Sequence, residues 1–199
     1  VTGTGDCPAL VADGKYETHV IGDAVVGTAC GPAPIEGDPS LLETTGSLSL
    51  LPNVVDPLRS LPAPDTCEKA SGPNPPIGAD DVIDAVYVYP QPVEITDKVS
   101  FGPGVHVFCT GLFIGKDAVV VGDAVTWYVV DGGVELAPNA SIFVTAPSDG
   151  PYAGVLLWSA GKTPVVIEPS ENVIELGGVV YVPDATLDML RDLRVLREQ

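Results

Sequence analysis

Short apolar runs separated by glycine, proline and aspartate fill the chain from Val82 onward. Most of these runs are three to six residues long and rich in valine and aromatic residues, which is typical of β-strands. The pattern predicts strands over 86–89, 93–95, 105–109, 112–114, 118–121, 125–130, 134–136, 141–145, 155–158, 165–167, 173–176 and 179–182.

The rest of the chain has a different pattern, and we expect four parts within a single domain. Residues 1–51 predict an N-terminal β region with shorter strands. Residues 52–81 are dense in proline and poor in β-branched residues, so they predict an extended wrap and not a strand of a sheet. Residues 82–186 then form the strand-rich body, and residues 187–199 form a terminal segment.

A turn of aspartate or asparagine, mostly followed by alanine, recurs where strands begin. Asp and Asn tolerate a left-handed backbone conformation and bond to their own main chain, and alanine keeps a corner narrow. The expected corners are centred on Asp23, Asp97, Asp117, Asp123, Asn139 and Asp184.

The spacing of these corners indicates the architecture. Asp97 and Asp117 are 20 residues apart, and Asp117 and Asn139 are 22 apart. Asn139 and Asp184 are 45 apart, which we interpret as two steps of about 22. A period of this length with several short strands per step is typical of a β-solenoid. We therefore expect an all-β fold, a right-handed parallel β-helix; an antiparallel sandwich or barrel is the alternative.

Residues 187–199 carry the most convincing helical pattern of the chain. Leu187, Leu190 and Leu193 fall on one helix face, and three arginines lie near the end, where they suit a helix C-terminus. An open solenoid end invites edge-to-edge aggregation. We therefore expect this helix to cap the last coil.

The charge balance restricts the partners. The 199-residue chain has 27 acidic and 9 basic residues, a net charge of −18, so nucleic acid and anionic membrane are not expected partners. No apolar run of about 18 residues occurs, so no membrane span is expected. The acidity is interpreted as a solvated coat. Calcium binding at Asp80, Asp81 and Asp84 is the weaker alternative, and no cofactor is otherwise expected.

Four cysteines, Cys7, Cys30, Cys67 and Cys109, indicate two disulfides and an exported protein at the cell surface or outside the cell. The sequence alone leaves three pairings open. Local closure, with Cys7 bonded to Cys30 and Cys67 to Cys109, is the simplest of them. Four buried thiols in a cytosolic protein are the alternative interpretation.

Candidate chemistry is sparse. The sequence has no phosphate-binding loop, nucleophile elbow or zinc motif, and His106 lies inside a strand pattern that suggests a structural or surface role. Parallel β-helices host polysaccharide lyases and hydrolases, but a lyase needs a basic, positively charged groove, and we expect no enzyme. Trp127, Tyr152 and Trp158 are expected to pack in the fold, with an exposed platform for glycan or protein contact as the alternative.

The segment from Phe101 to Leu187 resembles a segment of bacterial TadE/TadG-like proteins, which are associated with tight-adherence (Flp-type) pili. The resemblance rests, in order, on GPGVHVFCTGLFIGKDAVVV, WYVVDGGVELAPNAS, FVTAPSDGPYAGVLLW and GGVVYVPDATL. The Pro-rich run that contains Leu61-Pro62-Ala63-Pro64 and then Cys67 resembles the run that precedes this segment in the family. The resemblance also favours a pairing of Cys67 with Cys109.

The resemblance implies a non-enzymatic, exported structural or adhesive module of a pilus- or envelope-associated protein. Its expected partners are other envelope or pilus proteins, or a surface glycan. The alternatives are a carbohydrate-active β-helix enzyme, either a glycosidase or a lyase, and a calcium-dependent binding module.

Overall fold

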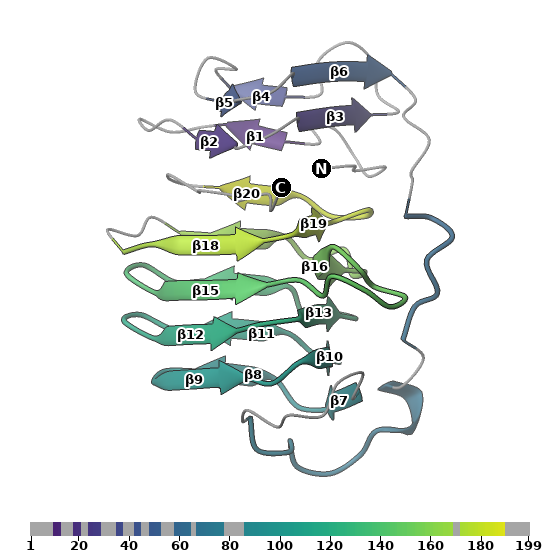
Figure 1. Ribbon diagram of the computed structural model, residues 1–199, viewed down its shortest axis with the longest axis vertical. Helices are drawn as coiled ribbons and strands as arrows, with labels where there is room; N and C mark the ends of the chain where they lie inside the picture. The colour runs from purple at the N-terminus through teal and green to yellow at the C-terminus, as the bar shows by residue number, and fades with distance from the viewer. Residues whose placement is uncertain are drawn as a thin grey trace.

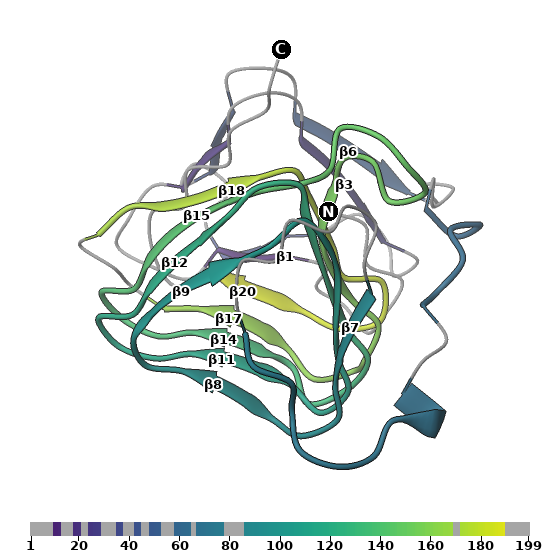
Figure 2. The same cartoon turned by 60° about the horizontal axis from the view of Figure 1, so that its bottom comes forward.

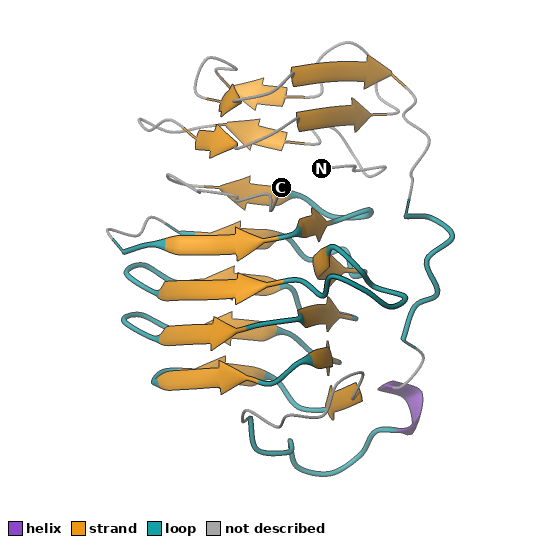
Figure 3. Ribbon diagram, viewed as in Figure 1, coloured by secondary structure: helices purple, strands orange, loops and turns teal. Residues whose placement is uncertain are grey.

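The computed structural model describes residues 58–64, 67–77, 86–168 and 172–189, together with the backbone of six N-terminal strands. Nearly all of its regular structure is parallel β-strand, stacked coil upon coil into a β-solenoid (Figures 1 and 3). Within the described residues the helical structure is one short 3-10 turn, η2 (Cys67–Lys69).

Three parallel sheets form the sides of the stack (Figure 2). Their strand orders are β4-β1-β20-β17-β14-β11-β8, β19-β16-β13-β10-β7 and β18-β15-β12-β9, and the pairs β2-β5 and β3-β6 form two smaller sheets. The strands are β1 (Leu10–Ala12), β2 (Thr18–Val20), β3 (Ala24–Thr28), β4 (Ile35–Gly37), β5 (Leu42–Thr44), β6 (Leu48–Pro52), β7 (Val86–Tyr89), β8 (Val93–Ile95), β9 (Lys98–Phe101), β10 (Gly104–Phe108), β11 (Leu112–Ile114), β12 (Val119–Gly122), β13 (Val125–Val129), β14 (Val134–Leu136), β15 (Ser141–Thr145), β16 (Val155–Ser159), β17 (Val165–Ile167), β18 (Ile174–Gly177), β19 (Val179–Tyr181) and β20 (Leu187–Met189).

The coil length follows from the register of the seven-stranded sheet. Paired residues in β8 and β11 are 19 positions apart, those in β11 and β14 are 22 apart, and those in β17 and β20 are 22 apart. Between β14 and β17 the step is 31 residues. The predicted parallel β-solenoid is confirmed and the antiparallel alternative is wrong. The interval from Asn139 to Asp184 is not two equal steps, because one coil carries an insertion.

An apolar core fills the interior of the stack. Side chains that point inward from neighbouring strands lie in columns, as do Val120, Ile142 and Ile174, which are 0%, 0% and 5% exposed. Near β7 and β8, which end two of the sheets, Ile77 packs against this core. The side chain of Asn74 holds the same segment in place, since it accepts a hydrogen bond from the Gln91 amide and donates one to the Gln91 carbonyl, at 2.8 and 3.1 Å.

The corners explain why Asp and Asn recur. Asp117 and Asn139 both have φ of 61°, the left-handed conformation that these two residue types tolerate best. The alanines that follow them, Ala118 and Ala140, are completely buried and let the chain turn tightly. Asp97 is not equivalent to Asp117. The Asp97 carbonyl accepts a hydrogen bond from the Val119 amide, and one coil later the Ala118 carbonyl accepts one from the Ser141 amide. Asp97 is therefore equivalent to Ala118. The 20-residue spacing from Asp97 to Asp117 is therefore not a coil length.

The remaining expected corners differ from one another. After Asp123, the left-handed residue is Ala124, with φ of 55°. The Asp123 carboxylate accepts a hydrogen bond from the hydroxyl of Thr145, one coil away. Asp184 is exposed at a bend after β19, and Asp23 lies outside the described residues.

Strands from the beginning of the chain cover the end of the stack at β20. β1 pairs in parallel with β20, Leu10 with Leu187 and Val11 with Asp188, and β4 pairs with β1 (Figure 1). The expected helix is wrong where the structure describes it, because Leu187–Met189 is strand β20. This segment continues the register of β17 and is also paired by β1, so ladder hydrogen bonds on two sides outweigh the local helical pattern. Residues 190–199 lie outside the described residues.

Candidate functional site

The three middle strands of the five-stranded sheet are buried on both of their faces. Every residue of β10, β13 and β16 is buried, whereas the described strands of the other two sheets largely alternate between buried and more exposed positions. Its outward side chains include a column of aromatic rings, Tyr128, Trp158 and Tyr181, whose centroids are 4.9 and 5.5 Å apart. These side chains form a second apolar cluster that is separate from the interior core.

The strap, defined as residues 58–64 and 67–70, packs on this outer face (Figure 1). Leu58 and Leu61 are partly buried against the outer apolar cluster. Proline lacks an N–H donor, so a Pro-rich strap leaves fewer backbone donors to be satisfied where it packs on apolar side chains.

A disulfide and a hydrogen bond fasten the strap to the solenoid. Cys67 and Cys109 form a disulfide with their Cα atoms 5.7 Å apart. The hydroxyl of Tyr152 donates a hydrogen bond to the carbonyl of Pro62 at 2.9 Å. The expected bond between Cys67 and Cys109 is confirmed, and Cys7 and Cys30 lie outside the described residues.

The long coil owes its length mainly to the connection between β15 and β16. Two residues join β12 to β13 in the coil before it, whereas residues 146–154, here called the inserted loop, join β15 to β16. The loop is closed by a hydrogen bond of 2.7 Å from the Gly154 amide to the Pro147 carbonyl. Two further backbone hydrogen bonds, each of 2.7 Å, connect it to the next coil: the Ala146 amide donates to the Gly177 carbonyl, and the Val179 amide donates to the Gly154 carbonyl. These bonds give the loop a defined shape.

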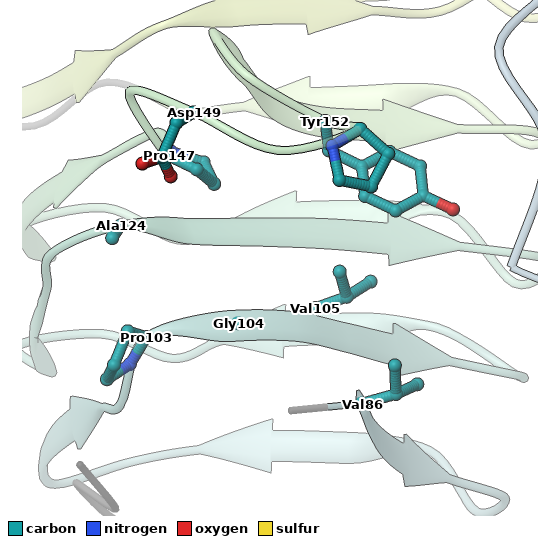
Figure 4. Close-up of a pocket in the computed structure, with 9 residues that line it drawn as sticks. Val86, Pro103, Gly104, Val105, Ala124, Pro147, Asp149 and Tyr152 are labelled. Carbon is teal, nitrogen blue, oxygen red and sulfur yellow. The ribbon is translucent and has the colours of Figure 1, made fainter. Parts of the chain in front are cut away.

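A pocket of about 170 Å³ lies under the inserted loop (Figure 4). Its walls are mostly apolar, and the polar side chains that line it are Asp149 and Tyr152. Burial raises the pKa of the Tyr152 phenol above its ordinary value, and the protonated hydroxyl donates a hydrogen bond to the Pro62 carbonyl. The lining residues are Val86, Pro103, Gly104, Val105, Ala124, Pro147, Asp149, Pro151 and Tyr152.

The three aromatic residues of the possible platform have different positions. Trp127 is 1% exposed inside the core, and Trp158 is 8% exposed on the outer face beside the strap. Both therefore pack in the fold, and an exposed platform at these two positions is wrong. Tyr152 is half-buried and joins the strap to the pocket.

His106 is buried, so the surface role that its strand pattern also allowed is wrong. Its ring is 1% exposed and stacks on Tyr87 at 4.7 Å. Its Nδ1 atom lies 3.1 Å from the Tyr89 hydroxyl, and its Nε2 atom lies 2.9 Å from the Gly102 carbonyl. Burial lowers the pKa of His106, and the hydrogen bond to Gly102 partly opposes this effect.

The lowered pKa predicts a pH dependence of stability. In the unfolded chain His106 takes up a proton as the pH falls through about 6.5, whereas the folded protein resists protonation until a lower pH, so stability falls over that interval. One proton gives a slope of at most about 1.4 kcal/mol per pH unit. Urea unfolding between pH 5 and 8 should show this loss in the natural protein and not in His106→Gln, which carries no titratable ring. Parallel pH profiles for the two proteins would contradict the prediction.

The acidic residues do not converge on a metal site in the part of the chain that the structure describes, where no group of three or more His, Cys, Asp or Glu side chains lies in reach of one ion. The weak calcium candidates Asp80, Asp81 and Asp84 lie outside the described residues.

Sequence reasoning missed the pocket under the inserted loop. The available signal was the length of the coil, since the turn-rich block APSDGPYAG separates two strands whose counterparts in the two preceding coils are joined by only two residues. Pro103 and Ala124 come from the two preceding coils, and only the stacking of the coils places them beside Asp149.

No helix among the described residues is long and apolar enough to cross a membrane. Comparison with known proteins found no matching family model, no matching curated protein and no matching solved structure.

Proposed function

We propose that this protein is a non-enzymatic structural or adhesive module of the bacterial envelope, exported and associated with pili, and that the inserted loop forms its contact surface. The observation that carries the proposal is the lengthening of one coil at this loop. Insertions into solenoid repeats map to loops on one face, and that face is often the one that binds.

The surroundings of the loop support this function. The strap, the disulfide and the Tyr152 hydrogen bond hold the loop on a sheet whose middle strands are packed on both faces. A disulfide of this kind is typical of proteins that function in an oxidising compartment. The net charge of −18 keeps the module soluble and repels anionic surfaces.

The test is a loop replacement in the producing bacterium. Residues 145–154 are replaced by the Asp-Ala pair that joins the equivalent strands one coil earlier, so the coil keeps a corner that this fold already uses. We expect the purified variant to keep its cooperative unfolding and the cells to lose most of their surface attachment. The unaltered gene restored to the same strain is the control.

Full attachment by cells with the replaced loop would overturn the adhesive role. Release of sugars from polysaccharides by the purified natural protein would instead favour a carbohydrate-active enzyme.

A further inference from the structure

The pocket under the inserted loop has the chemistry of a receptor for one side chain of a partner. We propose that it binds a lysine or arginine side chain presented by an extended segment of a partner protein, an inference that rests on the proposed function. A volume of about 170 Å³ has room for one side chain and is well below the roughly 300–1,000 Å³ of pockets that enclose drug-sized ligands.

The walls suit the methylene stem of a basic side chain. Val86, Val105 and three prolines provide apolar surface, and lysine and arginine bury their stems along such surface while the charged head stays near water. Val86 is 52% exposed, so apolar area at the rim is available for contact.

One carboxylate at the mouth suits the cationic head. Asp149 is exposed on the inserted loop and lies beside Pro147 (Figure 4). The Tyr152 hydroxyl points away from Asp149 and already donates a hydrogen bond to the Pro62 carbonyl. Asp149 is therefore the charged group that a ligand meets, and the net charge of −18 attracts cations toward it.

The same walls fit a sugar poorly. A bound sugar ring presents several hydroxyls, and each one that is removed from water without a partner costs free energy. The pocket offers one carboxylate for them. Two of its nearby backbone groups are already engaged, since the Gly104 amide donates to the Ala124 carbonyl at 2.9 Å.

The strap shows how a partner segment can approach. A Pro-rich segment of the protein itself already lies on this face, and its Pro62 carbonyl accepts a hydrogen bond from Tyr152. The pocket lies against the same tyrosine, so an extended segment of a partner can approach beside the strap and place one side chain under the loop.

The experiment titrates the full chain with three small probes and follows backbone amide shifts by nuclear magnetic resonance. The probes are N-acetyl-arginine methylamide, N-acetyl-norleucine methylamide, which is unbranched and uncharged, and methyl glucoside. We expect the arginine probe to shift the amides of Gly104, Ala124 and Asp149 with a dissociation constant in the millimolar range. The norleucine probe should bind about fivefold more weakly, the effect of one exposed charge pair.

Two matched variants isolate the carboxylate. Asp149→Asn should weaken the arginine probe about fivefold and leave the norleucine probe unchanged. Asp184→Asn, which removes an exposed carboxylate at a corner that does not line the pocket, should leave both unchanged. Equal binding of the arginine and norleucine probes, an unaltered arginine affinity in Asp149→Asn, or shifts with methyl glucoside alone would overturn the inference.

Failure of this inference is distinguishable from failure of the proposed function. If loop replacement abolishes attachment while Asp149→Asn cells attach normally and no probe binds, the ligand class is wrong and the adhesive role stands. If the arginine probe binds as described but neither variant changes attachment, the pocket is a basic-residue receptor in a protein that is not an adhesin.

Discussion

Replacing Gly132 by alanine should destabilise the protein by about 4 kcal/mol. Gly132 has φ of +81°, and a Cβ atom there would lie 2.0 Å from the backbone carbonyl oxygen of Thr110 in the preceding coil. The obstacle is backbone, which moves only if the two coils separate, so overpacking adds to the left-handed conformational cost. Urea unfolding monitored by circular dichroism measures the loss.

Gly154→Ala is the matched control for this variant. Gly154 has nearly the same φ, +77°, but a Cβ atom there would meet no atom within 4 Å. We expect a cost of about 1 kcal/mol, which is the conformational penalty alone. Equal losses at Gly132 and Gly154 would show that the coils are not in contact at the Gly132 turn.

Removing the strap disulfide should have a similarly large effect. The Cys67–Cys109 bridge closes a loop with a sequence separation of 42 residues, for which the loop-entropy model gives a stabilisation of about 4 kcal/mol. The double variant Cys67→Ala with Cys109→Ala should therefore unfold at a much lower urea concentration than the natural protein.

The same variant tests whether the disulfide holds the strap on the sheet. Leu61→Ala should cost about 1 kcal/mol with the bridge present, because Leu61 packs against the outer apolar cluster. In the bridge-free background the cost should be smaller by at least about 0.5 kcal/mol, since a loosened strap has less contact to lose. Identical costs in both backgrounds would mean that the strap stays docked without the bridge.

The architecture could be predicted from the sequence because the corners are local. Asp117 and Asn139 adopt a backbone conformation that few residue types tolerate, so their identity and spacing appear directly in the sequence. The strand runs of the body are equally local, and most of them match the observed strands within a residue or two. The repetition of this corner at Asp117 and Asn139, 22 residues apart, then indicates a stack of coils.

Two of the misjudged features depend on contacts between distant parts of the chain. The terminal segment that starts at Leu187 has a helical pattern, but β17 and β1 pair with it from both sides, and β1 comes from the other end of the sequence. Likewise the 45 residues between Asn139 and Asp184 are close to twice the expected period of about 22. Only the register of β14 with β17, a step of 31 residues, shows that one coil is longer.

The candidate site could be predicted only in part. The Cys67–Cys109 bond was the simplest local pairing, and the expectation that aromatic residues pack in the fold holds for Trp127 and Trp158. The pocket could not be predicted, because its wall combines Pro103, Ala124 and Asp149 from three successive coils.

The parallel stack itself is tested most directly by nuclear Overhauser contacts between β10 and β13. In this register the residue numbers of paired positions differ by a constant 21, as for Val105 with Thr126 and Val107 with Tyr128. We expect a series of interstrand contacts in which both residue numbers rise together. A series in which one number rises while the other falls would show antiparallel strands and contradict the solenoid.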